Sequence, residues 1–405
     1  MTKLDDFIET GLKIRSNIVF TSFDDNTYVL SNVESNTFYR VNKIVKNLLD
    51  LFDGKRSIKG VTKLFNEKYN FDFTNEQVTN IINIECLGRG IFDHEEIIKK
   101  NKKDEYLKIR IDLIPFKIVQ KISNLFSFLF EPKIFISINL FCVLTLLGLI
   151  FKYVSFKKLY DNLSPELLSY FIIFNLVSII LHEFGHASAC TKFGAKSGAI
   201  GFGFYLFTPV FYADVSDAWR LKKHQRVLVD LAGIYMQLIF CVTLSLIFLI
   251  SSNIFFLNIA VLILATTFIN INPFLRYDGY WVLSDSLGIP NLRHQSFMEL
   301  RSLLNFLFKR QKVYQITKKK IFLAIYSLLS ILFIINFLLF SIAYNHESIL
   351  YFPYNVFKFV IALFANFQSF TFIECKENIV KLILPLTFYI LIWRHLIKFL
   401  KSKKK

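Results

Sequence analysis

The sequence predicts a polytopic α-helical membrane protein of about six transmembrane helices, preceded by a small N-terminal α+β domain. The chain has 405 residues, of which 54% are hydrophobic and 17% aromatic, more apolar than a soluble domain of that size. From residue 134 onward the apolar residues form runs long enough to cross about 30 Å of hydrocarbon. Before residue 98 they form short runs broken by turn residues, which is typical of a soluble domain.

Residues 1–98 begin with a pattern of three short strands. We expect these strands at 18–20, 27–30 and 37–41, where β-branched and aromatic residues gather. The stretches SFDDN and SNVESN separate them and are rich in turn-forming residues. The sequence therefore predicts a small sheet of three strands at the start of the domain.

Three amphipathic helices are expected after the strands, each marked by a capping residue. Asn42 can cap the first helix and Ser57 the second. Thr74 and Gln77 form a T-x-x-Q capping box for the third, which should stop at Gly88–Gly90.

A charged stretch separates the two halves of the chain. Residues 91–92 could return as a short strand of the N-terminal domain. Residues 99–133 are interpreted as a charged linker and juxtamembrane segment. The run HEEIIKKNKKDEYLKIR at 94–110 suits a linker followed by a helix on an anionic lipid surface.

The remaining domain, 134–405, is expected to hold the membrane spans. These are 134–151, 167–190, 227–250, 254–275, 321–344 and 378–397. The segment 353–373 is also apolar but contains Pro353 and Lys358, so we expect it to be re-entrant or interfacial.

The charge pattern predicts the orientation of the chain. Lys and Arg number 48 against 31 Asp and Glu, which gives a net charge of +17. Most of this charge flanks the apolar runs, as the positive-inside rule expects of cytoplasmic loops. We therefore expect a multi-pass protein of a bacterial cell membrane with both termini in the cytoplasm, and no nucleic-acid partner.

The sharpest chemical signal is the motif LHEFGHA. His182 and His186 stand four residues apart, so one face of a helix offers two imidazoles to one metal ion, with Glu183 beside them. The alternative is a pair of buried histidines with other partners. Two histidines and a glutamate are costly to keep in an apolar helix without a function, which favours the metal.

A third ligand is needed, because catalytic zinc usually has three protein ligands and one open position. The stretch ININPFLRYDGYW supplies Asp278 at the end of the span 254–275. In the six-span model this span and 167–190 both run from outside to inside, so Asp278 and the histidines meet near the cytoplasmic face. A snorkelling or capping aspartate at the membrane border is the alternative.

The two motifs together carry a family resemblance. HEFGHA combined with N-x-x-P-x-x-x-x-D-G (Asn270, Pro273, Asp278, Gly279) resembles the site-2 protease family of intramembrane zinc metalloproteases. The strings FTPVFYADVSDAW, LVDLAG and NPFLRYDGYWVLSDSLGIPNLR resemble its bacterial branch of peptide zinc metalloproteases, often linked to maturation of ribosomally made peptides. This resemblance covers residues 170–300.

The resemblance implies roles for the motif residues. His182, His186 and Asp278 would bind Zn²⁺, and Glu183 would be the general base. Zinc would lower the pKa of a bound water and polarise the scissile carbonyl, while Glu183 moves the water proton to the leaving amine.

Further residues near the motifs are candidates for binding substrate. The resemblance implies that the turn from Asn270 to Pro273 bends the helix so that Asp278 faces the metal. Asn270 or Asn272 could donate a hydrogen bond to the oxyanion or the substrate, although an Asn beside Pro is commonly a turn residue. Residues 194–214 predict a membrane-embedded hairpin whose edge either holds an extended substrate or serves packing alone.

Four other polar residues near the motifs are first interpreted as structural or topological; they are Asp214, Asp217, His224 and Cys190.

The N-terminal domain resembles the PqqD-like winged-helix domains known as peptide recognition elements. The strings YRVN, LLDLFDGKRSI and LGRGIF carry this resemblance over residues 15–92. It implies that a leader peptide adds as a strand near Thr37–Val41, against the helix near Asn75–Leu87. A DNA-binding winged helix or an inert fold are alternatives, but NEQVTNIINIECL lacks the basic residues of a DNA-reading helix.

These observations favour a membrane zinc endopeptidase that captures a ribosomally made precursor peptide and cuts it near the cytoplasmic face. An exporter or a peptide-modifying enzyme would be a further partner. Two alternatives remain: regulated intramembrane proteolysis of a transmembrane regulator, and a non-catalytic transporter or immunity protein. Retention of Glu183 argues against the non-catalytic alternative, since a scaffold does not need the base.

Overall fold

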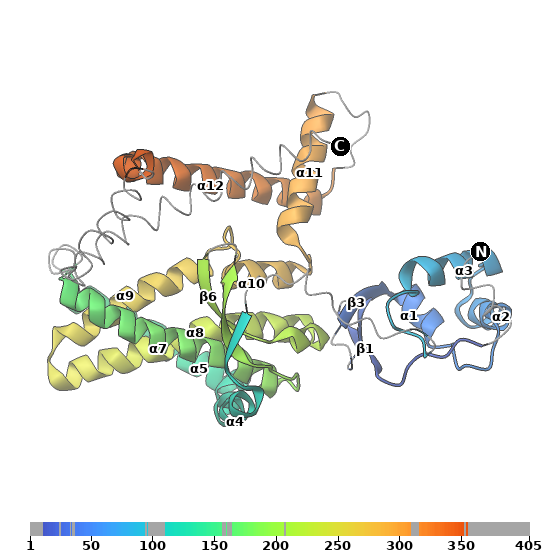
Figure 1. Ribbon diagram of the computed structural model, residues 1–405, viewed down its shortest axis with the longest axis horizontal. Coiled ribbons are helices and arrows are strands. Elements are labelled where there is room, and N and C mark those ends of the chain that lie inside the picture. Colours follow the sequence, from blue (N-terminus) through green and yellow to red (C-terminus); the bar gives the residue numbers. More distant parts are fainter. Residues whose placement is uncertain are drawn as a thin grey trace. The chain divides into compact units, whose positions relative to one another are not determined.

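The structure is a computed structural model, shown in Figure 1. It describes residues 11–23, 26–32, 34, 37–93, 95, 110–155, 159, 164–205, 208–308, 316–351 and 354. The chain divides into two compact units, Met1–Pro290 and Asn291–Lys405.

The first unit begins with a three-stranded antiparallel sheet. Its strands are β1 (Ile18–Ser22), β2 (Thr27–Asn32) and β3 (Thr37–Asn42), in the order β1-β2-β3. All three lie where the sequence predicts them, each one or two residues longer at its end. Because β2 is central, β1 and β3 are the edge strands of this sheet.

Three helices follow the sheet: α1 (Lys43–Leu49), α2 (Ile58–Tyr69) and α3 (Asn75–Glu85). Asn42 and Ser57 cap α1 and α2 by accepting hydrogen bonds from backbone amides one turn on. The predicted capping box of α3 is present.

One expectation for this domain is wrong, since 91–92 form no named strand. Phe92 makes an isolated bridge to Ile14, and the ring of Phe92 is buried in the domain core. This core also includes Leu30, Phe65 and Ile82 from the sheet and the helices.

Four long apolar helices follow in the same unit, and α7, α8 and α9 lie side by side (Figure 1). Their bounds are α5 (Pro132–Tyr153), α7 (Pro165–Lys192), α8 (Lys223–Ser251) and α9 (Ile254–Ile271). The second unit holds α11 (Leu292–Leu307) and α12 (Lys318–Leu350).

Within the described residues, five helices are long and apolar enough to cross a membrane; they are α5, α7, α8, α9 and the part of α12 from Lys318 to Asn336. They correspond to the first five predicted spans. The predicted span 378–397 and the segment 353–373 lie outside the described residues, apart from Tyr354.

The span predicted at 254–275 ends earlier than expected. Helix α9 stops at Ile271 with Asn272 as its cap, since Pro273 has no amide proton to continue the helix. A separate short helix, α10 (Asp278–Leu287), starts at Asp278 itself. This aspartate therefore begins a helix instead of ending a span.

The segment expected to be a charged linker with a juxtamembrane helix contains an unpredicted strand. β4 (Arg110–Ile114) pairs with β5 (Ile200–Tyr205), and β5 pairs with β6 (Thr208–Ala213) in the predicted hairpin. The strand forms because long-range contacts stabilise it. Arg110 donates hydrogen bonds to Tyr212 and Asp214, which lie about a hundred residues further on. The amphipathic helix α4 (Phe116–Phe126) and the short helix η3 (Ser127–Phe130) follow β4.

Candidate metal centre

Three of the predicted site residues come together in the structure. The Nε2 atoms of His182 and His186 on α7 are 3.1 Å apart. Asp278 at the start of α10 places Oδ2 at 2.9 Å from Nε2 of His182 and Oδ1 at 3.6 Å from Nε2 of His186. Each residue thus offers one ligand atom, all within 4.8 Å of one another, which fits a single metal ion. Two imidazoles and a carboxylate are a donor set that zinc accepts in catalytic sites.

Close backbone packing positions Asp278. A Cβ atom at Gly279 would stand 1.9 Å from the carbonyl oxygen of Ile271, so only glycine lets the start of α10 approach the end of α9 so closely. The turn formed by residues 272–277 between the two helices brings the carboxylate to the histidines on α7.

The histidines are held in fixed orientations by helix α8. Nδ1 of His186 lies 2.7 Å from the carbonyl oxygen of Val229, so it carries the proton and donates it there. Nδ1 of His182 lies 3.1 Å from Oε1 of Gln237, and Nε2 of Gln237 donates to Ser178 at 3.2 Å. These contacts use the Nδ1 atoms and leave both Nε2 atoms directed at the candidate metal position, because a histidine that binds zinc commonly donates its other ring proton to a nearby acceptor.

Gln237 was not among the residues predicted for the site. The available signal was a glutamine in the middle of an apolar span, and Gln237 is 1% exposed in the structure. The direction of its side chain depends on how α8 packs against α7, which the one-dimensional pattern does not show.

Glycine also sets the distance between α7 and α8. A Cβ atom at Gly233 would lie 2.5 Å from the ring of His182 and 2.6 Å from that of His186. A Cβ atom at Gly185 would lie 2.4 Å from the carbonyl oxygen of Ala232. The two helices therefore cross at paired glycines directly beside the candidate metal ligands.

Glu183 is buried beside the histidines, and the backbone amide of Ala213 at the end of β6 donates to it. Sheet β4-β5-β6 therefore approaches the site through its edge strand β6. This arrangement puts a carboxylate, a two-histidine face and a strand edge in one region, as hydrolysis of an extended chain requires.

The electrostatics of Asp278 suit a metal ligand. Burial by itself would raise the pKa of this carboxyl group. When the rings of His182 and His186 are protonated, their charge outweighs that effect and holds the pKa of Asp278 well below its ordinary value. A cation bound between the same three residues would favour the ionised carboxylate in the same way.

The two candidate asparagines lie at the end of α9. Asn270 is in its last turn, and Asn272 caps the helix. Oδ1 of Asn272 accepts from the amide of Phe274 at 2.8 Å, which is the hydrogen bond of a turn residue. The structure thus gives Asn272 a local structural contact.

Asp214 and Cys190, two of the residues interpreted as structural, have structural surroundings. Asp214 accepts hydrogen bonds from Arg110 and from Ser216. Cys190 is fully buried in an apolar cluster, and His224 lies in the first turn of α8.

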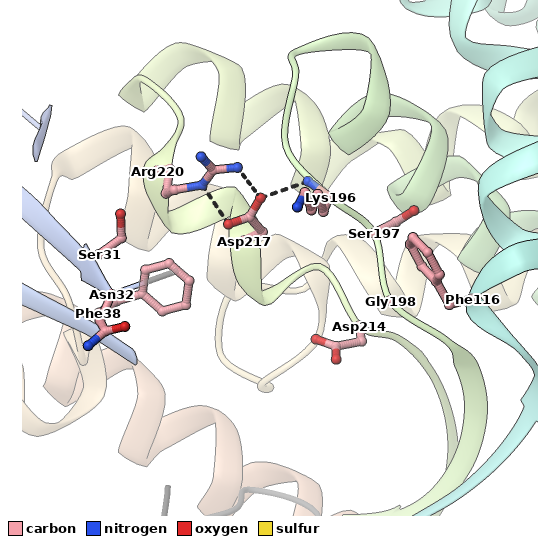
Figure 2. A pocket seen from close by; sticks show the side chains of 10 residues that line it. All are labelled: Ser31, Asn32, Phe38, Phe116, Lys196, Ser197, Gly198, Asp214, Asp217 and Arg220. Atoms are coloured by element: carbon pink, nitrogen blue, oxygen red, sulfur yellow. Dashed lines mark hydrogen bonds and ion pairs between the residues drawn. The ribbon is translucent and has the colours of Figure 1, made fainter. Parts of the chain in front are cut away.

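A pocket of about 280 Å³ lies apart from the metal centre, and Figure 2 shows the ten residues that line it. Asp217 is the centre of its polar contacts, because it accepts from the amide of Lys196 at 2.7 Å and from Nε of Arg220 at 2.5 Å. Phe38 of β3 and Phe116 of α4 also line the pocket. None of His182, Glu183, His186 and Asp278 does so.

Comparison with known proteins supports a zinc metalloprotease. The chain is 29% identical over 202 residues to a curated protein of Bacillus subtilis (strain 168) named "Putative peptide zinc metalloprotease protein YydH". The match covers 47% of this chain and 77% of that protein. No family model and no solved structure matches the chain.

Proposed function

We propose that the protein is a membrane-embedded zinc endopeptidase of the site-2 protease type that cleaves a ribosomally made precursor peptide. The observation that carries the proposal is the convergence of His182, His186 and Asp278 around one point, with Glu183 beside them. The similarity to a protein named as a peptide zinc metalloprotease supports the same chemistry.

The four residues would have two different roles, metal binding and proton transfer. His182, His186 and Asp278 would hold Zn²⁺, which when bound lowers the pKa of a water molecule and polarises a peptide carbonyl. Glu183 accepts the proton of the attacking water and returns it to the leaving amine nitrogen. The buried position of Glu183 keeps its carboxylate away from bulk water and from competing partners.

The proposed binding site for the scissile segment of the substrate is the edge of β6. A protease needs its substrate extended, because a helix hides its own carbonyl groups. β6 is an edge strand of its sheet, and the amide of Ala213 at its end already faces Glu183. A substrate strand added along β6 would therefore run past the catalytic carboxylate.

The N-terminal domain is the proposed leader-binding module, in line with its PqqD-like pattern. β3 is an edge strand of its sheet, so a leader peptide could add as a further strand along Thr37–Val41, against the α3 region Asn75–Leu87. Phe38 also lines the pocket in Figure 2, together with Gly198 and Asp214, which lie at the ends of the β5–β6 hairpin. A peptide bound along β3 could continue through this pocket towards β6.

The proposed setting is a bacterial cell membrane with both termini in the cytoplasm, where the leader of a newly made precursor is available. An exporter or a peptide-modifying enzyme would act on the same precursor. Helix α3 has no basic residue, so nucleic acid is not a proposed partner.

The test compares host cells that carry the wild-type protein with cells that carry Glu183→Gln, which removes the base and keeps the shape. Mass spectrometry of medium and membranes should show a short exported peptide disappearing and its longer precursor accumulating. Glu166→Gln is the matched control, because Glu166 is an exposed residue at the start of the same helix. Loss of a membrane-protein fragment would instead favour regulated intramembrane proteolysis, and identical peptide profiles would favour a non-catalytic scaffold.

A further inference from the structure

A buried ion pair joins helix α10 to helix α8. Nε of Arg226, in the first turn of α8, donates to Oδ2 of Asp285 on α10 at 2.8 Å. Arg226 is 2% exposed and Asp285 9%. Nη1 of Arg226 also donates to the carbonyl oxygen of Leu221 at 2.9 Å, and the ring of Phe23 covers the guanidinium at 4.1 Å. The arginine is therefore fixed on several sides before it meets its partner.

The two helices that this pair joins are the ones that build the metal centre. Helix α8 holds both histidine rings through Val229 and Gln237. Helix α10 carries Asp278, and Asp285 follows it by about two turns, so the two carboxylates project from the same side of the helix. Helix α10 is thus held at two points, at the histidines through Asp278 and at Arg226 through Asp285.

Loss of either partner would leave the other charge buried without its ion pair. Arg226 and Asp285 are both buried, and removing one member of a buried pair is strongly destabilising because the remaining charge is uncompensated. An uncompensated charge would weaken the contact between α8 and α10, and Asp278 would then move away from the histidines.

We propose that Arg226 and Asp285 are positioning residues that preorganise Asp278 and thereby set the affinity of the site for Zn²⁺. The inference rests on the proposed role of Asp278 as a ligand. The ion pair lies two helical turns from Asp278 and does not touch the metal, yet it would set the affinity of the site for Zn²⁺.

The test measures Zn²⁺ affinity of the purified full-length protein in detergent, by competition with a chromophoric chelator. Arg226→Met and Asp285→Asn should each weaken the affinity about 10-fold to 100-fold, the size of effect that residues behind metal ligands have. Arg226→Lys should lie between wild type and Arg226→Met, since it keeps the charge and loses the planar fork. Arg56→Met is the control, because Arg56 forms an exposed ion pair with Asp53 in the N-terminal domain.

A rescue variant separates positioning from a general loss of stability. Arg226→Met combined with Asp285→Leu replaces the pair by apolar side chains, which a buried site commonly tolerates. It should recover the affinity to within about threefold of wild type, and Co²⁺ spectra should return to the wild-type shape. Wild-type affinity in both single variants would overturn the proposal, and so would a double variant as weak as the singles. Full zinc binding by Asp278→Ala would instead overturn the ligand set of the proposed function.

Discussion

Gln237 is the residue on which the orientation of His182 depends. Its amide oxygen accepts from Nδ1 of the histidine, while its amide nitrogen donates to Ser178. A neutral amide thus occupies the place that a carboxylate or a backbone carbonyl takes behind many metal-bound histidines. The amide fixes the imidazole tautomer without adding a charge to the apolar interior.

Replacing this amide tests its role. Gln237→Leu removes the acceptor, so the ring of His182 is free to turn and its Nδ1 proton is left unpaired. We expect Zn²⁺ affinity to fall about 10-fold to 100-fold. Gln237→Glu is the matched control, because it keeps an acceptor oxygen and should bind zinc nearly as tightly as wild type. The assignment is wrong if the leucine variant keeps wild-type affinity in the chelator competition.

At this scale, the motif spacing and the second motif predicted which side chains meet, since the structure places Asp278 beside His182 and His186. Metal binding by these three residues and the role of Glu183 as a base stay predictions. Gln237 and Gly233 could not be predicted, because their roles depend on the crossing of α7 and α8. Asn272 is a turn residue by its hydrogen bond, which matches the structural alternative for it.

At the scale of helices and strands, the crossing of α7 and α8 brings the residues of the candidate metal centre together. The helices meet at Gly185 and Gly233, where the surrounding atoms leave no room for a methyl group. Small residues at such contacts let membrane helices approach closely and pack by van der Waals contact. The close approach lets Val229 and Gln237 reach the rings of the histidines.

Gly233→Ala should therefore damage the metal centre. Its Cβ would stand 2.5 Å from the ring of His182 and 2.6 Å from that of His186, well inside van der Waals contact, so the rings or the helices must shift. We expect the purified variant to retain less than a tenth of the wild-type zinc, measured by elemental analysis after dialysis. Gly148→Ala is the control, because a Cβ there meets nothing within 4 Å and alanine favours the helix. Equal zinc content in both variants would show that the crossing tolerates a methyl group.

Elements also differed in how well the sequence predicted them. The strands and caps of the N-terminal domain were predictable because they follow from local turn and capping chemistry. β4 was not, because its pairing with β5 depends on residues about ninety positions away. The boundary between α9 and α10 was misplaced because apolar composition continues past Ile271, whereas the backbone turns at Asn272 and Pro273.

The path of the whole chain through the membrane is constrained by the metal centre. His182 and His186 lie near the C-terminal end of α7, and Asp278 follows the C-terminal end of α9. Their contact requires α7 and α9 to run in the same direction, with α8 returning between them. This agrees with the order of spans predicted from apolar runs alone, in which both helices end on the cytoplasmic side.

The same order predicts the sides of the later segments. If residues 1–98 are cytoplasmic, α5, α8 and α12 run outward, and the end of α12 near Tyr351 is outside. The tail KSKKK then returns to the cytoplasm through the span 378–397, provided that 353–373 does not also cross.

Single cysteines placed at Lys223, Tyr351 and Lys405 in a cysteine-free background would be treated with a membrane-impermeant maleimide in intact cells. We expect labelling only at Tyr351, and labelling at Lys405 in addition would show that 353–373 spans the membrane. Labelling at Lys223 would reverse the orientation, and would place the metal centre on the side of the membrane where a newly made precursor is absent.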